Sequence, residues 1–170
     1  MRTRLIAGLA FVLSLVCIAS AARAGDTDVR KEFEATYRRQ IEAFMKKDIR
    51  TYMEPLSLDF SFKPKNMPAS NRRQFEDRVR EDMEKPNSKW LMRINKLTVT
   101  GNKAIATTSH QFSYTFTSQH GVTHSFAWSV KRRETWVKGA RGWEIKHIED
   151  MKYGKFTVDG KQVRMDNGIL

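Results

Sequence analysis

Apolar residues recur at helical spacing in the first third of the chain. Between residues 29 and 44 they stand four, four, four and three positions apart, as Val29, Phe33, Tyr37, Ile41 and Phe44. This spacing puts them on one face of an amphipathic helix. Two further helices are expected. Asp48 can cap a short one that ends at Pro55, and the pair Asn71 and Gln74 resembles the capping box of another.

The pattern changes to the two-residue alternation of β-strands in two places. Leu56, Leu58, Phe60 and Phe62 alternate with polar residues, which predicts a strand with one buried face. Four longer strands are expected over residues 90–100, 104–117, 122–138 and 142–151. The order of elements is therefore long helix, short helix, strand, helix and then an antiparallel sheet.

Two turns predict how the last three strands are aligned. Residues 119–121 fit a three-residue hairpin loop with Gly121 in the left-handed conformation, so that Phe112 faces Trp128. The pair Gly139-Ala140 fits a two-residue loop, so that Trp136 faces Trp143 and Arg132 faces His147. A slip of one residue would put the two tryptophans on opposite faces, which is why we prefer this alignment.

The second alignment gathers polar side chains on the face that carries the aromatic residues. Arg132, Glu134, His147 and Glu149 project from it, and His110 lies one strand away. A few converging polar groups among aromatic side chains are typical of a ligand pocket. We expect a ligand there to contact Tyr37, His110, Trp128, Arg132, Glu134 and Trp136.

His147 is the candidate acid–base residue of this pocket, and Glu149 is a second catalytic candidate. Histidine changes charge near neutral pH and can therefore give or take a proton. The alternative interpretation is structural, because Arg132 could bridge the two glutamates and complete a buried ion-pair network with His147. The sequence leaves both interpretations open.

The sequence lacks the residues that a metal site, a serine hydrolase or a nucleotide-binding site would need. His110 and His124 share a face, but no third ligand converges with them, so we expect no metal site. The chain has no Gly-x-Ser-x-Gly elbow, no phosphate-binding loop and no dinucleotide fingerprint. We therefore expect no cofactor.

Several stretches carry a resemblance to a known family. They are AFMKKD (43–48), LDF (58–60), VTGNKAIA (99–106), RETWVK (133–138) and GWEI (142–145). Together with the order of elements they resemble the nuclear transport factor 2-like superfamily, especially its SnoaL-like and ketosteroid isomerase-like branches. The resemblance covers about residues 28–152. It implies an α+β, cone-shaped fold with N-terminal helices packed on a strongly curved antiparallel sheet around a cavity.

The resemblance leaves the activity open. Members of the superfamily include isomerases, polyketide cyclases and dehydratases, and also non-enzymatic binding or dimerising domains, so the fold does not choose the function. Ketosteroid isomerases use an Asp base and a Tyr-centred oxyanion hole. Tyr37 and Tyr52 are available for the second role, but no Asp lies on the predicted cavity face.

The first 24 residues look like a signal peptide. Arg2 and Arg4 precede an apolar run, and Ala22-Arg23-Ala24 offers a cleavage site near Ala24. We therefore expect a signal peptide over residues 1–24, a SnoaL-like domain over 25–152 and a C-terminal tail over 153–170, in a periplasmic or secreted protein. The only cysteine, Cys17, lies in the apolar run, which excludes disulfides and thiol catalysis in the remaining chain.

The net positive charge of the chain predicts a preference for anionic partners. The chain has a formal charge of +12, and removal of the three arginines of the signal segment would leave +9. A basic exported protein suits acidic ligands and would be weakly attracted to anionic envelope surfaces. No nucleic-acid-binding motif is found, so we expect no nucleic acid partner.

Three functional hypotheses follow from these observations. The preferred one is an exported domain that binds a small, partly apolar ligand in its cone, with an anionic group facing Arg132. The second is an isomerase, dehydratase or cyclase with His147 as acid–base residue. The third is a non-catalytic homodimer whose cavity is filled by side chains. The sequence does not decide whether the protein is an enzyme.

Overall fold

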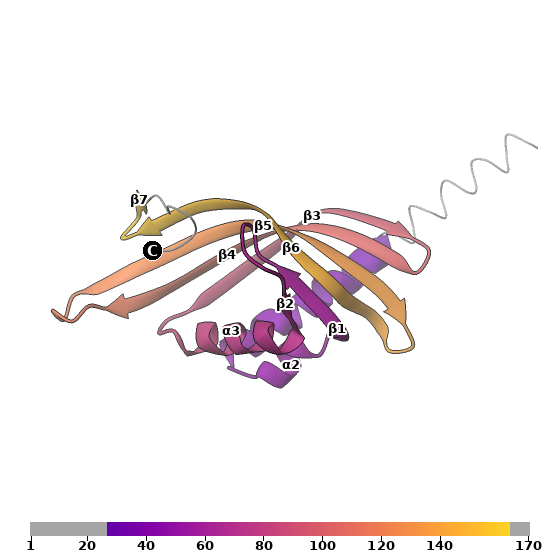
Figure 1. Cartoon of the computed structure of the whole chain (residues 1–170), viewed down its shortest axis with the longest axis horizontal. Coiled ribbons are helices and arrows are strands. Elements are labelled where there is room, and N and C mark those ends of the chain that lie inside the picture. Colours follow the sequence, from indigo (N-terminus) through magenta and orange to yellow (C-terminus); the bar gives the residue numbers. More distant parts are fainter. Residues whose placement is uncertain (1–26, 164–170) are drawn as a thin grey trace, which may run out of the picture.

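The computed structural model describes residues 27–163. The helices lie on one side of a seven-stranded sheet, as Figure 1 shows. The strand order is β2-β1-β6-β5-β4-β3, with β7 paired to β6. This architecture confirms the predicted α+β fold. The expected signal peptide and its cleavage site near Ala24 lie outside the described residues, and no helix within residues 27–163 has both the length and the apolar character to cross a membrane.

The helices follow the sequence signals closely. The N-terminal helix runs through residues 27–45 and buries Phe33, Tyr37 and Phe44. Helix α2 (Ile49–Met53) begins where the Asp48 carboxylate accepts a hydrogen bond from the Thr51 amide. Helix α3 (Arg72–Glu84) starts with the predicted capping box and buries Phe75, Val79 and Met83.

The sheet differs from the expected one in two respects. Its strands are β1 (Leu56–Lys63), β2 (Ser70–Asn71), β3 (Lys89–Thr100), β4 (Lys103–Thr117), β5 (Thr123–Gly139), β6 (Gly142–Val158) and β7 (Lys161–Val163). Strand β1 runs parallel to β6, so the sheet is mixed. The sheet also arches over the helices without curling strongly (Figure 1).

Two local expectations change with these strands. Leu58 is 84% exposed instead of buried, because the pairing of β1 with β6 shifts between Leu56 and Ser61. The expected tail begins inside the sheet, since β6 continues to Val158 and β7 follows it.

The β4–β5 hairpin has the predicted register. Phe112 faces Trp128 and Tyr114 faces Phe126. The Ser118 amide donates to the Val122 carbonyl at 2.9 Å, and Gly121 has φ +76°, in the left-handed region. The face toward the helices therefore carries Ala104, Ala106, Thr108, His110 and Phe112, all of which are buried.

The predicted register of the β5–β6 hairpin is wrong. Gly139 faces Gly142, so Ala140 and Arg141 form the loop, and Trp136 faces Ile145. This difference of two residues keeps Trp136 and Trp143 on the same buried face.

A bulge beyond this point reverses the next part of β6. Trp136 pairs with Ile145 but Thr135 pairs with His147, which leaves Lys146 as an extra residue in β6. Glu134 consequently faces Ile148, and Arg132 faces Asp150 instead of His147. The bulge turns Ile148 and Asp150 toward the helices, and it turns His147 and Glu149 to the outer face.

Candidate functional site

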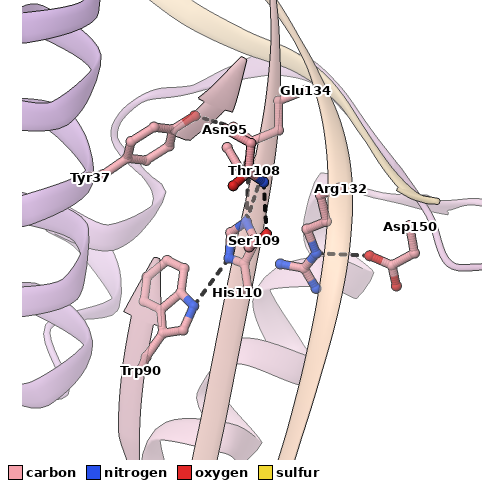
Figure 2. Close-up of polar contacts among 9 residues, drawn as sticks. All are labelled: Tyr37, Trp90, Asn95, Thr108, Ser109, His110, Arg132, Glu134 and Asp150. Carbon is pink, nitrogen blue, oxygen red and sulfur yellow. Dashed lines mark hydrogen bonds and ion pairs between the residues drawn. The ribbon is translucent and has the colours of Figure 1, made fainter. Parts of the chain in front are cut away.

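A fully buried carboxylate lies on β5, next to the N-terminal helix. The Glu134 side chain is 1% exposed and accepts three hydrogen bonds, shown in Figure 2. The Tyr37 hydroxyl donates to Oε2, the Thr108 hydroxyl donates to Oε1 at 2.9 Å, and His110 Nε2 lies 3.3 Å from Oε1. Burial alone would raise the pKa of Glu134, but the hydrogen bonds from His110, Tyr37 and Thr108 outweigh it and hold that pKa below its usual value.

His110 completes this network in its neutral form. Trp90 Nε1 donates to His110 Nδ1 at 3.2 Å, so Nδ1 must accept and the ring hydrogen stands on Nε2, toward Glu134. Burial, together with the nearby Arg132 charge, lowers the pKa of His110. Burial and the Glu134 charge likewise raise the pKa of Tyr37, which keeps the phenol protonated.

Little space remains beside this network. The cavity that touches Tyr37, His110 and Glu134 measures about 10 Å³, which is room for roughly one water molecule. The four polar groups therefore satisfy one another and hold the N-terminal helix against the sheet.

Arg132, two residues before Glu134 on β5, has different surroundings. Arg132 Nε donates to Asp150 Oδ1 at 2.8 Å, and both side chains are largely buried. Burial opposes the charge on Arg132, but the pairing with Asp150 outweighs it and raises the pKa of the guanidinium. The two terminal amino groups of Arg132 have no hydrogen-bond partner in residues 27–163.

Arg132 borders an open pocket between α3 and the sheet. It measures about 250 Å³ and is walled mainly by aromatic side chains, including Phe62, Trp128 and Phe156. Arg78 reaches it from α3. The Phe62 ring lies 5.3 Å from Arg132 Cζ and 6.0 Å from Arg78 Cζ, so both guanidinium groups pack against one aromatic ring.

The predicted ligand-binding residues divide between these regions. Arg132 and Trp128 line the pocket. Tyr37, His110 and Glu134 belong to the sealed network instead. Trp136 is fully buried and stacks on Phe33 with ring centroids 4.0 Å apart, so it supports the core.

The structure does not bring the two catalytic candidates into the pocket. His147 Nδ1 lies 2.8 Å from the Ser61 hydroxyl, and Glu149 pairs with Arg133 at 3.3 Å. Both contacts lie on the outer face. The reason is the Lys146 bulge, where the Lys146 side chain forms an ion pair with Asp59 of β1.

Several pocket residues were not predicted from the sequence. Asp150 does lie on the cavity face, contrary to expectation, because the bulge moves it there. Tyr153 also lines the pocket, next to Tyr52, which the sequence offered as one of two tyrosines for an oxyanion hole, and burial raises the pKa of both phenols. Arg78 had a usable signal, since it stands three residues after Phe75 and so shares the buried side of α3.

The described residues do not form a metal site. Among residues 27–163 no three His, Cys, Asp or Glu side chains come together in a way that could hold a metal ion.

Solved structures share the fold at low sequence identity. A conserved protein from Planctomyces limnophilus superposes with a TM-score of 0.60 at 12% identity, covering 72% of this chain and 94% of its own. A protein from Kribbella flavida gives 0.60 at 11% identity, covering 80% and 95%. An NTF2-like protein with a cystatin-like fold from Novosphingobium aromaticivorans gives 0.57 at 17% identity, covering 76% and 85%. At such identities the likeness concerns the fold alone.

The sequence itself gives a more direct assignment. A comparison with curated proteins yields no match. The family model of the SnoaL-like domain matches residues 33–149, which include α2, α3, the Glu134 network and Arg132. This match covers more than half of the chain and shows that the chain belongs to the SnoaL-like domain family.

Proposed function

We propose that this domain binds a small, partly apolar molecule with an anionic group in the pocket between α3 and the sheet. The observation that carries the proposal is the Arg132 guanidinium. Asp150 fixes it through Nε, while its terminal amino groups remain without a partner at the wall of an aromatic pocket. An arginine in this state can donate two parallel hydrogen bonds to a carboxylate.

Arg78 strengthens the preference for an anion. It lines the same pocket and forms no ion pair with any residue of the described chain, whereas Asp82 beside it pairs with Lys85. Asp150 is likewise engaged by Arg132. The pocket thus holds one unpaired positive charge, and a bound anion would neutralise it.

The size and the walls of the pocket define the rest of the ligand. The volume of about 250 Å³ lies just below the roughly 300 Å³ at which common ligand pockets begin. Flat apolar groups fit such aromatic walls best. A one- or two-ring carboxylic acid therefore has the chemistry that this site would take.

A ligand panel tests the proposal. Benzoate, naphthoate and cyclohexanecarboxylate would each be compared with the uncharged amide of the same skeleton. We expect the acids, but not the amides, to raise the melting temperature, and calorimetry to give matching affinities, because a ligand at 100 times its Kd stabilises the fold by about 2.7 kcal/mol. Equal stabilisation by acids and amides, or by neither, would remove the anionic ligand from the proposal.

Two variants tie the binding to the two arginines. Arg78→Gln removes an unpaired cation, so we expect stability to change little and affinity for the acid to fall roughly tenfold. Arg73→Gln, on the exposed side of the same helix, is the matched control. Arg132→Gln is best made together with Asp150→Asn, because the double change leaves no buried charge unpaired.

The enzyme alternative would now rest on Asp150. This carboxylate lines the pocket together with two protonated phenols, Tyr52 and Tyr153. A carboxylate base beside neutral hydroxyl donors is suited to proton transfer at carbon. Deuterium uptake from heavy water into a bound carbonyl ligand, followed by NMR and abolished in Asp150→Asn, would favour this alternative over simple binding.

A further inference from the structure

The outer face of the sheet, away from the helices, carries a concentration of unpaired positive charge. Five exposed cations stand there, and we call them the outer basic patch: Lys89, Arg93, Lys131, Lys152 and Lys155. None of the five forms an ion pair with a residue of the described chain, although Arg133 on the same face pairs with Glu149. The patch is independent of the pocket, which lies on the opposite side of the sheet.

The strand register places these charges unusually close together. Arg93, Ser109, Lys131 and Lys152 form one row across β3, β4, β5 and β6. Lys131 and Lys152 are directly opposite each other, an arrangement of like charges that destabilises a sheet. No acidic side chain stands in the described outer rows between the Arg133–Glu149 pair and the Ser125–Asp159 contact. An anion bound there would relieve the repulsion.

The patch surrounds a hollow with an uncharged polar floor. Two grooves of about 550 and 410 Å³ adjoin on this face and share Leu91, Gln111 and Ser129. Gly154 lets the Ser129 hydroxyl lie close against the β6 backbone, since a Cβ atom there would come within 2.1 Å of the hydroxyl oxygen. The floor consists of hydroxyl and amide groups from Ser109, Gln111, Ser113 and Ser129.

Ser109, at the floor of the hollow, has a hydroxyl hydrogen that the Asn95 contact does not use. Asn95 Nδ2 donates to the Ser109 hydroxyl oxygen at 2.7 Å, and both residues are labelled in Figure 2. The hydroxyl hydrogen of Ser109 therefore remains available for an acceptor outside the protein.

We propose that the outer basic patch binds an acidic polysaccharide. Such a chain presents carboxylate or sulfate groups at intervals, with neutral hydroxyls between them. The cations of the patch complement the acid groups, and the serine and glutamine floor complements the hydroxyls. The rows from Lys89 to Arg93 span about 14 Å along the strands, and four strands span a similar width, so the patch can follow an extended chain.

Other occupants fit the same surface less well. Single-stranded nucleic acids are held by aromatic stacking, and the outward positions of these rows carry no aromatic side chain. A membrane surface is held by inserted apolar groups, and among the described residues of these rows and their edges Leu91 and Met151 are the exposed large apolar ones. A second copy of the chain would bring two identical positive patches together.

The test measures binding of a size-defined heparin oligosaccharide to the purified protein, with uncharged dextran as the neutral control. We expect heparin to bind, dextran not to bind, and the affinity to fall steeply with salt. The triple variant Arg93→Gln/Lys131→Gln/Lys152→Gln should lose affinity roughly tenfold or more. The matched variant Arg38→Gln/Lys46→Gln/Arg73→Gln removes the same charge from exposed positions in or directly after the helices and should lose less than about threefold.

Defined outcomes would overturn the proposal. Equal losses in the two triple variants would show that net charge alone attracts the polymer. Binding of polyphosphate, single-stranded DNA or phosphatidylglycerol vesicles as tightly as heparin, with the same loss in the outer variant, would remove the assignment to a polysaccharide. Gln111→Ala/Ser129→Ala provides a second check, because it should weaken heparin binding a few-fold and leave polyphosphate binding unchanged.

Discussion

Glu134 and Arg132 stand two residues apart on the same face of β5, yet their surroundings differ in kind. Glu134 accepts from Tyr37, Thr108 and His110, and the space beside it measures about 10 Å³. Arg132 uses Nε for Asp150 and presents its other donors to a pocket of about 250 Å³. A polar cluster whose hydrogen bonds are all satisfied and that has no space beside it maintains the fold. A cluster that keeps free donors next to an open pocket can bind a ligand.

The largest expected effect comes from removing the sealed carboxylate. Glu134→Ala leaves the Tyr37 and Thr108 hydroxyls and His110 Nε2 without an acceptor in the core. We expect a loss of about 3–5 kcal/mol in the free energy of unfolding, measured by urea denaturation. Arg133→Ala, on the next, exposed residue, should change it by less than about 0.5 kcal/mol. A stable Glu134→Ala protein that fails to bind the carboxylate ligand would contradict the division between network and pocket.

Asp150→Asn tests the pocket beside Arg132. The substitution leaves Arg132 without its counter-charge, but the guanidinium borders the pocket and retains access to water. We expect a smaller loss of stability, about 1–3 kcal/mol. Affinity for benzoate should rise by roughly three- to tenfold, because a negative charge beside the site is removed. Glu149→Gln, the matched change on the outer face, should leave the affinity unaltered, and a lower affinity in Asp150→Asn would contradict the anion assignment.

The sealed network should also make stability depend on pH. The pKa of His110 is lowered in the fold by burial and Arg132, so below pH about 6.5 the unfolded chain takes up a proton that the folded chain does not. Stability should therefore fall between pH 7 and pH 5. Glu134 acts in the same direction at lower pH, because its stabilising contribution is lost as the pH falls through its lowered pKa.

The His110→Gln variant is the control for this pH dependence, and the quantity to compare is the slope of stability against pH. His110→Gln should flatten the decline between pH 7 and pH 5, whatever its effect on stability at pH 7. An unchanged slope in that variant would mean that His110 does not carry the dependence.

The sequence predicted the helices and the β4–β5 hairpin because local signals determine them. The caps at Asp48 and Asn71 and the left-handed Gly121 act within a few residues, and all three form as expected. The β5–β6 pairing failed at two places: the loop consists of Ala140 and Arg141 instead of Gly139 and Ala140, and nothing local marks the Lys146 bulge. The bulge lies beside β1, a strand more than eighty residues earlier, whose Asp59 pairs with Lys146.

The extra residue Lys146 accounts for most of the wrong predictions about the site. Strand alternation after the bulge exchanges the two faces, so His147 and Glu149 leave the predicted pocket and Asp150 enters it. Arg132, Trp128 and Glu134 come before the bulge and keep their predicted face. Which of these faced a cavity and which were sealed depended on the packing of the helices, and no spacing in the sequence contains that information.

His147 provides the smallest and most selective test of this alignment. In the structure its ring lies on the outer face and meets only the Ser61 hydroxyl at 2.8 Å among the hydrogen bonds of the described residues. Replacement by alanine should therefore cost less than about 1 kcal/mol and leave ligand affinity unchanged. If His147 faced the pocket beside Arg132, the same substitution would alter binding of the carboxylate, and its ring protons would shift in NMR spectra as the ligand is added. The contrast is sharpest against Trp128→Phe, because Trp128 lines the pocket and the loss of its larger ring should reduce ligand affinity several-fold.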